Sequence, residues 1–172
     1  DYIRNMLLLG LVFTDTDPLK GEEYFIKTIN LSKTSAPNED FGAVPLTPDE
    51  NNFAGGYKGI DRFTKGSSYT QVSAYIHLLR LYTTLNRLDD AEKIFDLMQI
   101  KFGANLENYL DSLMLTEVSF YHLNKGNLKN AEKYALLAIK KISNNDLNSM
   151  ISVSSSIRLA QVLMQQKKYE TK

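Results

Sequence analysis

The chain has 172 residues, of which 43% are hydrophobic and 23% charged, as in an ordinary globular domain with a sizeable core. Its 20 basic residues equal its 20 acidic residues, so no net field draws it to nucleic acid or an anionic membrane. The absence of cysteine excludes disulfides, thiol catalysis and cysteine metal sites, and it suits a reducing compartment.

The first part of the chain predicts two helices. Residues 2–14 are apolar nearly all round, as in a helix covered on several sides. The most apolar run, 6–13, is too short to cross a bilayer, which takes about 20 residues. Asp15 and Asp17 follow it, where a signal peptide would need small residues. Asp17 followed by Pro18 marks the start of a second helix, which we expect to end before residue 35.

Residues 36–66 interrupt the helical pattern. Three of the four prolines and five of the nine glycines fall here, together with several aromatic side chains. A disordered linker would be poorer in aromatics. We therefore expect an ordered, irregular insertion that packs its rings against the helices. The glycine-rich stretch 55–59 lacks the preceding strand and the Gly-Lys-Ser/Thr ending of a phosphate-binding loop.

The rest of the chain predicts helical pairs. We expect helices at about 67–85 and 89–102, then at 106–124 and 128–142, and a last one at 147–166 followed by a turn at 167–170. The second helix of each complete pair opens on a near copy of one heptapeptide, Arg-Leu-Asp-Asp-Ala-Glu-Lys at 87–93 and Asn-Leu-Lys-Asn-Ala-Glu-Lys at 127–133. Such repetition indicates a stack of helical hairpins.

These hairpins resemble tetratricopeptide repeats, which place large residues on the first helix and small or aromatic residues where the second helix meets it. The second and third copies carry the pattern through Tyr75, Leu78, Tyr82, Ala91 and Phe95, and through Leu115, Val118, Ser119, Ala131 and Ala138. Degenerate copies at the two ends use Leu8, Leu9, Val12, Gly21 and Phe25, and Leu159, Ala160, Leu163 and Tyr169. Ala91, Ala131 and Ala160 are the predicted points of close helix contact.

The resemblance implies an all-α fold: a right-handed α-α superhelix of about three hairpins plus a partial fourth. The expected units are 2–35, 67–103, 106–143 and 147–172, with the insertion at 36–66. Two positions of the repeat depart from the pattern in the first and second copies. A small residue expected on the first helix is replaced by Leu9 and Leu79, and one expected on the second helix is replaced by Thr28 and Met98. A generic helical bundle or a HEAT-type repeat is the alternative. We interpret 1–172 as one domain and expect it to be part of a longer protein.

Members of the family bind extended peptides or helices along a concave face lined by the first helix of each pair. The resemblance places on that face Ile76, Arg80, Thr83, Leu113, Thr116, Phe120, Leu123, Ile157, Gln161 and Met164. The alternative is that these side chains are buried against the insertion or a neighbouring part of the parent protein. A chaperone-type carboxylate clamp is not expected, since Arg80 stands without the lysine and asparagine that such a clamp needs.

No catalytic, cofactor or metal site is expected. His77 and His122 are too few and too far apart for a metal site, and the pairs Asp89-Asp90 and Glu22-Glu23 lie at helix starts, where the helix dipole favours carboxylates. The sequence thus predicts a non-catalytic protein-interaction scaffold that docks a protein or peptide partner, with no nucleic acid and no membrane span. We expect it inside the cell, in the cytoplasm or nucleus. The alternatives are a regulatory sensor domain for a signalling peptide or small ligand, and a non-catalytic domain of a larger enzyme.

Overall fold

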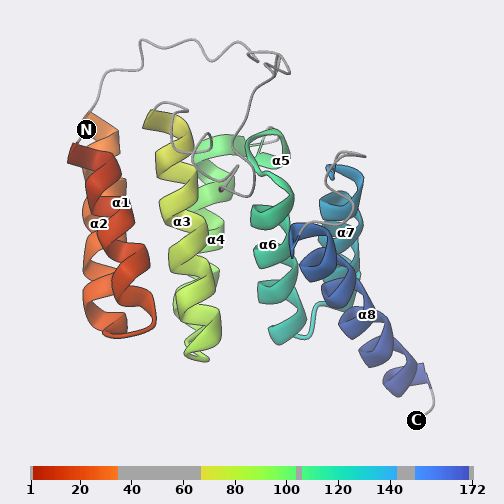
Figure 1. Ribbon diagram of the computed structural model, residues 1–172. Coiled ribbons are helices and arrows are strands. Elements are labelled where there is room, and N and C mark those ends of the chain that lie inside the picture. Colours follow the sequence, from red (N-terminus) through yellow and green to blue (C-terminus); the bar gives the residue numbers. More distant parts are fainter. Residues whose placement is uncertain (1, 35–66, 104–105, 143–149, 171–172) are drawn as a thin grey trace.

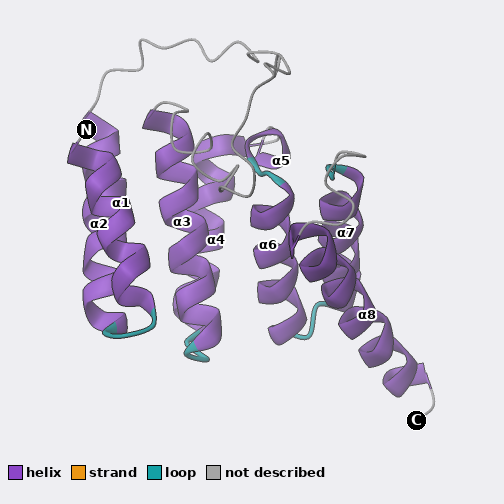
Figure 2. Cartoon of the chain, in the orientation of Figure 1, coloured by secondary structure: helices purple, strands orange, loops and turns teal. Residues whose placement is uncertain are grey.

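A computed structural model describes residues 2–34, 67–103, 106–142 and 150–170. The insertion predicted at 36–66 lies outside this part of the chain. The described elements are α1 (Tyr2–Thr14), α2 (Pro18–Thr34), α3 (Ser67–Thr84), α4 (Leu88–Phe102), α5 (Leu106–Tyr109), α6 (Ser112–Asn124), α7 (Leu128–Lys140) and α8 (Met150–Glu170). Within these ranges there is no strand (Figure 2), so the predicted all-α class is confirmed.

The helices pack as antiparallel pairs that follow one another in chain order (Figure 1). The pairs are α1 with α2, α3 with α4, and α6 with α7, while α8 packs on both α6 and α7. Helix α3 contacts α1, α2, α4 and α6, and α6 is enclosed in the same way. The core therefore centres on α3 and α6, where Leu79, Leu115 and Val118 are fully buried. None of the helices in the described part is long and apolar enough to cross a membrane.

The two turns that follow the repeated first helices have the same geometry. Asn86 has a φ of 55°, and Gly126, forty residues later, has a φ of 77°. The amide of Arg87 donates to the carbonyl of Tyr82 at 2.8 Å, and that of Asn127 donates to His122 at 2.9 Å. Glycine and asparagine tolerate this left-handed backbone better than other residues do. The repeated sequence therefore produces a repeated turn.

Small residues let the paired helices approach closely. A Cβ atom added at Gly10 would lie 2.5 Å from the ring of Phe25, so α1 and α2 could not pack as they do with a larger residue there. Ala91 and Ala131 are fully buried, and the Ser119 hydroxyl donates to the Ala131 carbonyl at 2.7 Å, in agreement with the predicted contact points. Ala160 is exposed, so the prediction of a third contact point there is wrong.

Two predicted helix boundaries are also wrong. The helix expected over 106–124 is two helices, because Asp111 between them has extended backbone (φ −79°, ψ 178°) and caps α6 by accepting the Met114 amide at 2.9 Å. An N-cap residue lies outside the helix that it caps, so the helix cannot run through it. The turn expected at 167–170 is absent, since α8 continues to Glu170.

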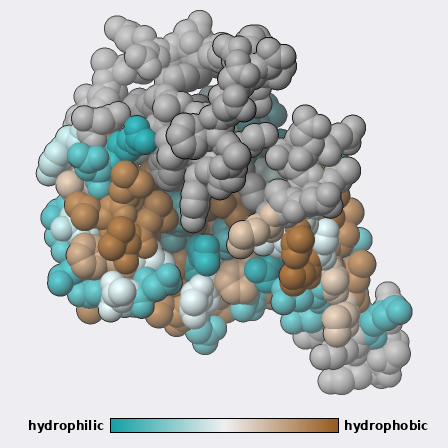
Figure 3. Space-filling model, viewed as in Figure 1, coloured by the Kyte–Doolittle hydropathy of each residue, from teal (hydrophilic) through white to brown (hydrophobic). Residues whose placement is uncertain are grey.

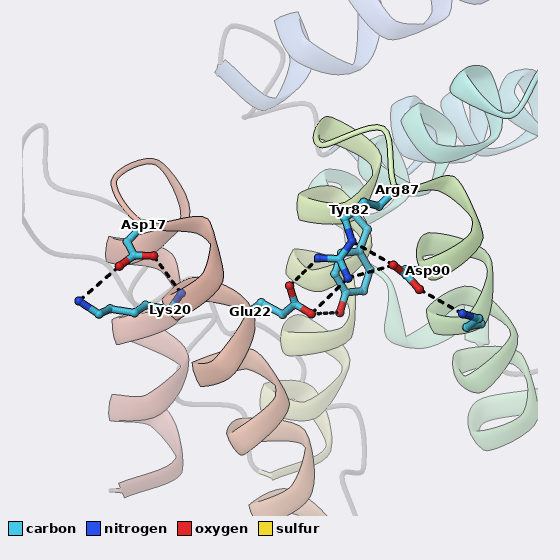
Figure 4. Close-up of polar contacts among 7 residues, drawn as sticks. Asp17, Lys20, Glu22, Tyr82, Arg87 and Asp90 are labelled. Carbon is cyan, nitrogen blue, oxygen red and sulfur yellow. Dashed lines mark hydrogen bonds and ion pairs between the residues drawn. The ribbon is translucent and has the colours of Figure 1, made fainter.

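A glutamate joins each hairpin to the next unit. Glu22, Glu92 and Glu132 are each the fifth residue of the second helix in their pair. Glu22 accepts from the Tyr82 hydroxyl and from Arg87, both at 2.7 Å (Figure 4). Glu92 pairs with Lys125, and Glu132 accepts from the Gln166 amide at 2.7 Å. The three contacts form a ladder along the stack, which we call the glutamate ladder.

Helix α8 packs against its neighbours mainly through hydroxyl groups. Among its described side chains only Ser155 and Val162 are buried. The Ser155 hydroxyl lies 2.8 Å from that of Thr116 and 3.5 Å from that of Ser112. Ser112 in turn donates to the Ala138 carbonyl at 2.9 Å. The α8 contact thus buries far less apolar surface than the central helices do.

Candidate functional site

Four residues of the predicted binding face are in the core. Exposure is 2% for Ile76, 3% for Thr83, 3% for Thr116 and 8% for Leu123. Their helices, α3 and α6, are covered by neighbours on more than one side, so these four side chains offer almost no surface to a partner. The two threonine hydroxyls are also bonded within the protein, to the carbonyls of Leu79 and Ser112 respectively. The prediction that these four side chains line an accessible face is wrong.

The other predicted residues remain at the surface. Arg80 and Gln161 are exposed, and Leu113 and Phe120 are half-buried. Ile157 and Met164 on α8 are 53% and 63% exposed. All lie on α3, α6 or α8, which share the near side of the molecule in Figure 1. In the same view, hydrophobic surface gathers over α1 and over part of α8 (Figure 3).

Two further residues, Glu117 and Arg158, complete this surface. An Arg80 Nη1 lies 3.5 Å from Oε1 of Glu117. The guanidinium of Arg158 lies 4.2 Å from the centre of the Phe120 ring and donates to Gln161 at 2.7 Å. We call the surface formed by Arg80, Glu117, Phe120, Arg158 and Gln161 the arginine face. Sequence reasoning missed Arg158, although its spacing of three from Gln161 puts both on one side of a helix.

The arginine face carries two positive charges and one negative charge. Burial raises the pKa of Glu117, while the positive charges of Arg80 and Arg158 oppose that shift. Burial also lowers the pKa of Arg158, and its Nε is buried with no hydrogen-bond partner in the described part of the chain. The surface therefore offers guanidinium donors to an anionic group.

A pocket of about 460 Å³ lies on another part of the molecule, between α4 and the turn from α6 to α7. One side of α4 forms a wall with Glu92, Phe95, Asp96 and Gln99. The opposite side consists of the end of α6, the turn and the first turn of α7. We call this the α4–α7 pocket, and no sequence pattern predicted it.

His122 lines the α4–α7 pocket and is only 5% exposed. Its ring stacks on Tyr134 at 5.4 Å between centroids and meets the rings of Phe95 and Tyr121 at 5.0 and 4.9 Å. Neither ring nitrogen has a hydrogen-bond partner among the described residues. Burial, with the nearby charges of Lys125 and Lys133, lowers the pKa of His122 to about 4. The imidazole is therefore uncharged at neutral pH.

The pKa of the second histidine, His77, is lowered in the same way, but this residue lies in another part of the molecule. His77 stacks on Phe25 at 5.6 Å, and burial is the main cause that lowers its pKa to about 4. It belongs to α3, whereas His122 belongs to α6. In the described ranges, no three His, Cys, Asp or Glu side chains come together in a group that could hold a metal ion.

Comparison with known proteins gives no match: no family model fits the chain, and no curated protein or solved structure resembles it significantly. The resemblance to tetratricopeptide repeats stays a prediction from the residues quoted above.

Proposed function

We propose that this chain is a non-catalytic protein-interaction scaffold, a tetratricopeptide-like segment of a right-handed superhelix that docks a protein or peptide partner within a larger assembly. The observation that carries the proposal is the arginine face, which joins side chains from three successive units. An intracellular location, consistent with the lack of cysteine, belongs to the same proposal.

The chemistry of the face defines the partner. Two guanidinium groups flank a carboxylate that is itself largely buried, and exposed Ile157 and Met164 lie on the same helix as Arg158. Because Arg158 already rests on Phe120 and bonds Gln161, little side-chain freedom is lost when it binds a ligand. We expect the partner segment to present a carboxylate next to apolar side chains.

A peptide-display screen against the purified chain tests this proposal. Enriched peptides should combine acidic and apolar residues. The substitution Arg80→Glu should weaken their binding by about tenfold or more, as when a charged hydrogen bond is lost. Lys129→Glu is the matched control, because it makes the same charge change at an exposed site on α7, away from the face. Equal binding by both variants and the unsubstituted chain would rule out the arginine face as the docking surface.

A further inference from the structure

One side of α8 is apolar and exposed. Its side chains recur at intervals of three and four residues, the spacing that aligns them along one side of a helix. The set comprises four large side chains that are each more than half exposed, Met150, Val153, Ile157 and Met164, and the exposed Ala160. We call these five residues the α8 stripe. At 3.6 residues per turn the stripe lies opposite Ser155 and Val162, the two buried side chains of this helix.

The α8 stripe continues the surface through which each unit meets the next. In the preceding unit, Phe120 of α6 packs against Arg158 of α8 at 4.2 Å. The Thr116 hydroxyl, one helical turn earlier, lies 2.8 Å from that of Ser155. The counterpart of Thr116 in the next copy of the repeat is Ile157, which is exposed. The surface that α8 covers on α6 is therefore repeated on α8, where it is open to another helix.

The order of side chains in the stripe suits a second copy of α8 in the antiparallel orientation. In a heptad, Met150, Ile157 and Met164 occupy one apolar position, and Val153 and Ala160 occupy the other. An antiparallel pair places one of these positions against the other, so Ile157 would face Ala160 of the second copy, and Met164 would face Val153. Each larger side chain then meets a smaller one, and the two surfaces interlock.

The charges on α8 favour the same orientation. Between residues 150 and 167 the charged side chains are Arg158 and Lys167. Arg158 rests on Phe120, away from the stripe, whereas Lys167 extends the stripe by one heptad step. A parallel pair would bring two Lys167 side chains together. An antiparallel pair would separate them by about 25 Å along the helix axis, well beyond the Debye length of about 8 Å.

We propose that this chain forms a twofold-symmetric dimer through the α8 stripe, with the two copies of α8 packed antiparallel. The stripe is about 22 Å long, and two of them in contact would together bury about 1,000 Å², at the lower limit of a specific interface. Both copies use the same surface, so the contact closes at two copies. The dimer does not depend on the docking function proposed above, because Arg80 lies on α3, outside the stripe.

Sedimentation velocity of the 172-residue chain over a range of concentrations tests self-association. An interface of this size should give a monomer–dimer equilibrium with a dissociation constant of about 10–100 µM. A chain that stays monomeric at about 500 µM would overturn the proposal, since a dimer of that affinity would then be abundant. Species that grow beyond a dimer would also overturn it, because they indicate a head-to-tail contact that does not close.

Charged substitutions on α8 test the surface. Val153→Glu should weaken the dimer about tenfold or more, because it would bury a carboxylate against an apolar side chain of the other copy. Gln165→Glu is the matched control, since it adds the same charge at an exposed position of α8 outside the stripe, and it should leave the dissociation constant unchanged. Arg80→Glu should also leave it unchanged, so the dimer and the arginine face can fail separately. A Val153→Glu chain that dimerises as tightly as the unsubstituted chain would show that the stripe is not the interface.

Single-cysteine variants test the orientation, because the chain has no cysteine of its own. In the antiparallel pair, residue 153 of one copy faces residue 164 of the other, whereas the two copies of either residue lie about 16 Å apart along the axis, too far for a disulfide. A mixture of Val153→Cys and Met164→Cys chains should therefore crosslink under mild oxidation, and neither variant alone should. Crosslinking of either variant alone as fast as the mixture would overturn the antiparallel arrangement.

Discussion

At the scale of single residues, the two histidines make stability depend on pH. Both have pKa values near 4 in the folded chain, against about 6.5 when unfolded. The unfolded chain therefore binds more protons between these values, and the contribution to stability is complete above pH 6.5 and is lost as the pH falls toward 4. Glu117 acts in the opposite direction, because burial raises its pKa.

The substitution His122→Phe should remove part of this dependence. Between about pH 7.5 and about pH 5, the free energy of unfolding should fall by roughly 2 kcal/mol less in the variant than in the unsubstituted chain, since one proton-linked site is gone. Urea unfolding at the two pH values measures the difference. Identical losses in both proteins would show that His122 is not held neutral by its surroundings.

Some residue-scale features could be predicted from the sequence and others could not. Asp17 was expected to cap a helix, and its carboxylate accepts the Lys20 amide at 3.3 Å. The helix expected to end at residue 102 does end there, and Gly103, which follows it, has a φ of 55°. Both are local, because each depends on a few adjacent residues. The environment of His122 depends on Phe95 and Tyr134, which come from two other helices, and no short-range pattern encodes that meeting.

At the scale of helices, close pairing through small residues leads to a second prediction. Ala131→Leu should lower the free energy of unfolding by about 1–3 kcal/mol, because the larger side chain has no space where α7 meets α6. The same substitution at exposed Ala160 is the matched control and should change stability by less than about 0.5 kcal/mol. Urea unfolding of both variants gives the comparison; equal effects would mean that Ala131 is not a tight contact.

The presence and approximate length of the helices were predictable because apolar periodicity and capping residues are encoded locally. The break at Asp111 was missed, since Asp111 lies inside a stretch whose apolar residues continue on both sides. The burial of four residues of the predicted binding face was missed for a different reason. Ile76 and Thr116 are buried by helices from other units, and the family pattern assumes a more open first-helix surface than this chain has.

At the scale of the whole molecule, the glutamate ladder should make neighbouring hairpins unfold together. In repeat architectures stability is a sum of unit terms and nearest-neighbour terms. Replacing Glu22 by glutamine weakens the polar contact between α2 and the unit formed by α3 and α4. Backbone amides of α1 and α2 should then exchange with solvent roughly fivefold faster.

Hydrogen-exchange measurements on three proteins test this coupling. The control is Glu23→Gln, because the ion pair of Glu23 with Lys27 at 2.6 Å lies inside α2, and it should leave exchange in α1 close to that of the unsubstituted chain. The signal for the ladder was present in the sequence, as Glu92 and Glu132 follow the repeated alanines Ala91 and Ala131. Their partners could not be read from it, because Lys125 and Gln166 occupy different places in their units.

The packing of α8 through hydroxyl groups couples two equilibria, the docking of this helix and the binding of a ligand to the arginine face. Arg158 and Gln161 belong to α8, whereas Arg80 and Phe120 come from helices deeper in the stack, so the arginine face is assembled only while the last helix is docked. Any ligand that bridges both sets would hold α8 in place as it binds, and its measured affinity would include the work of docking that helix. Recognition and the docking of α8 would then be one thermodynamic event.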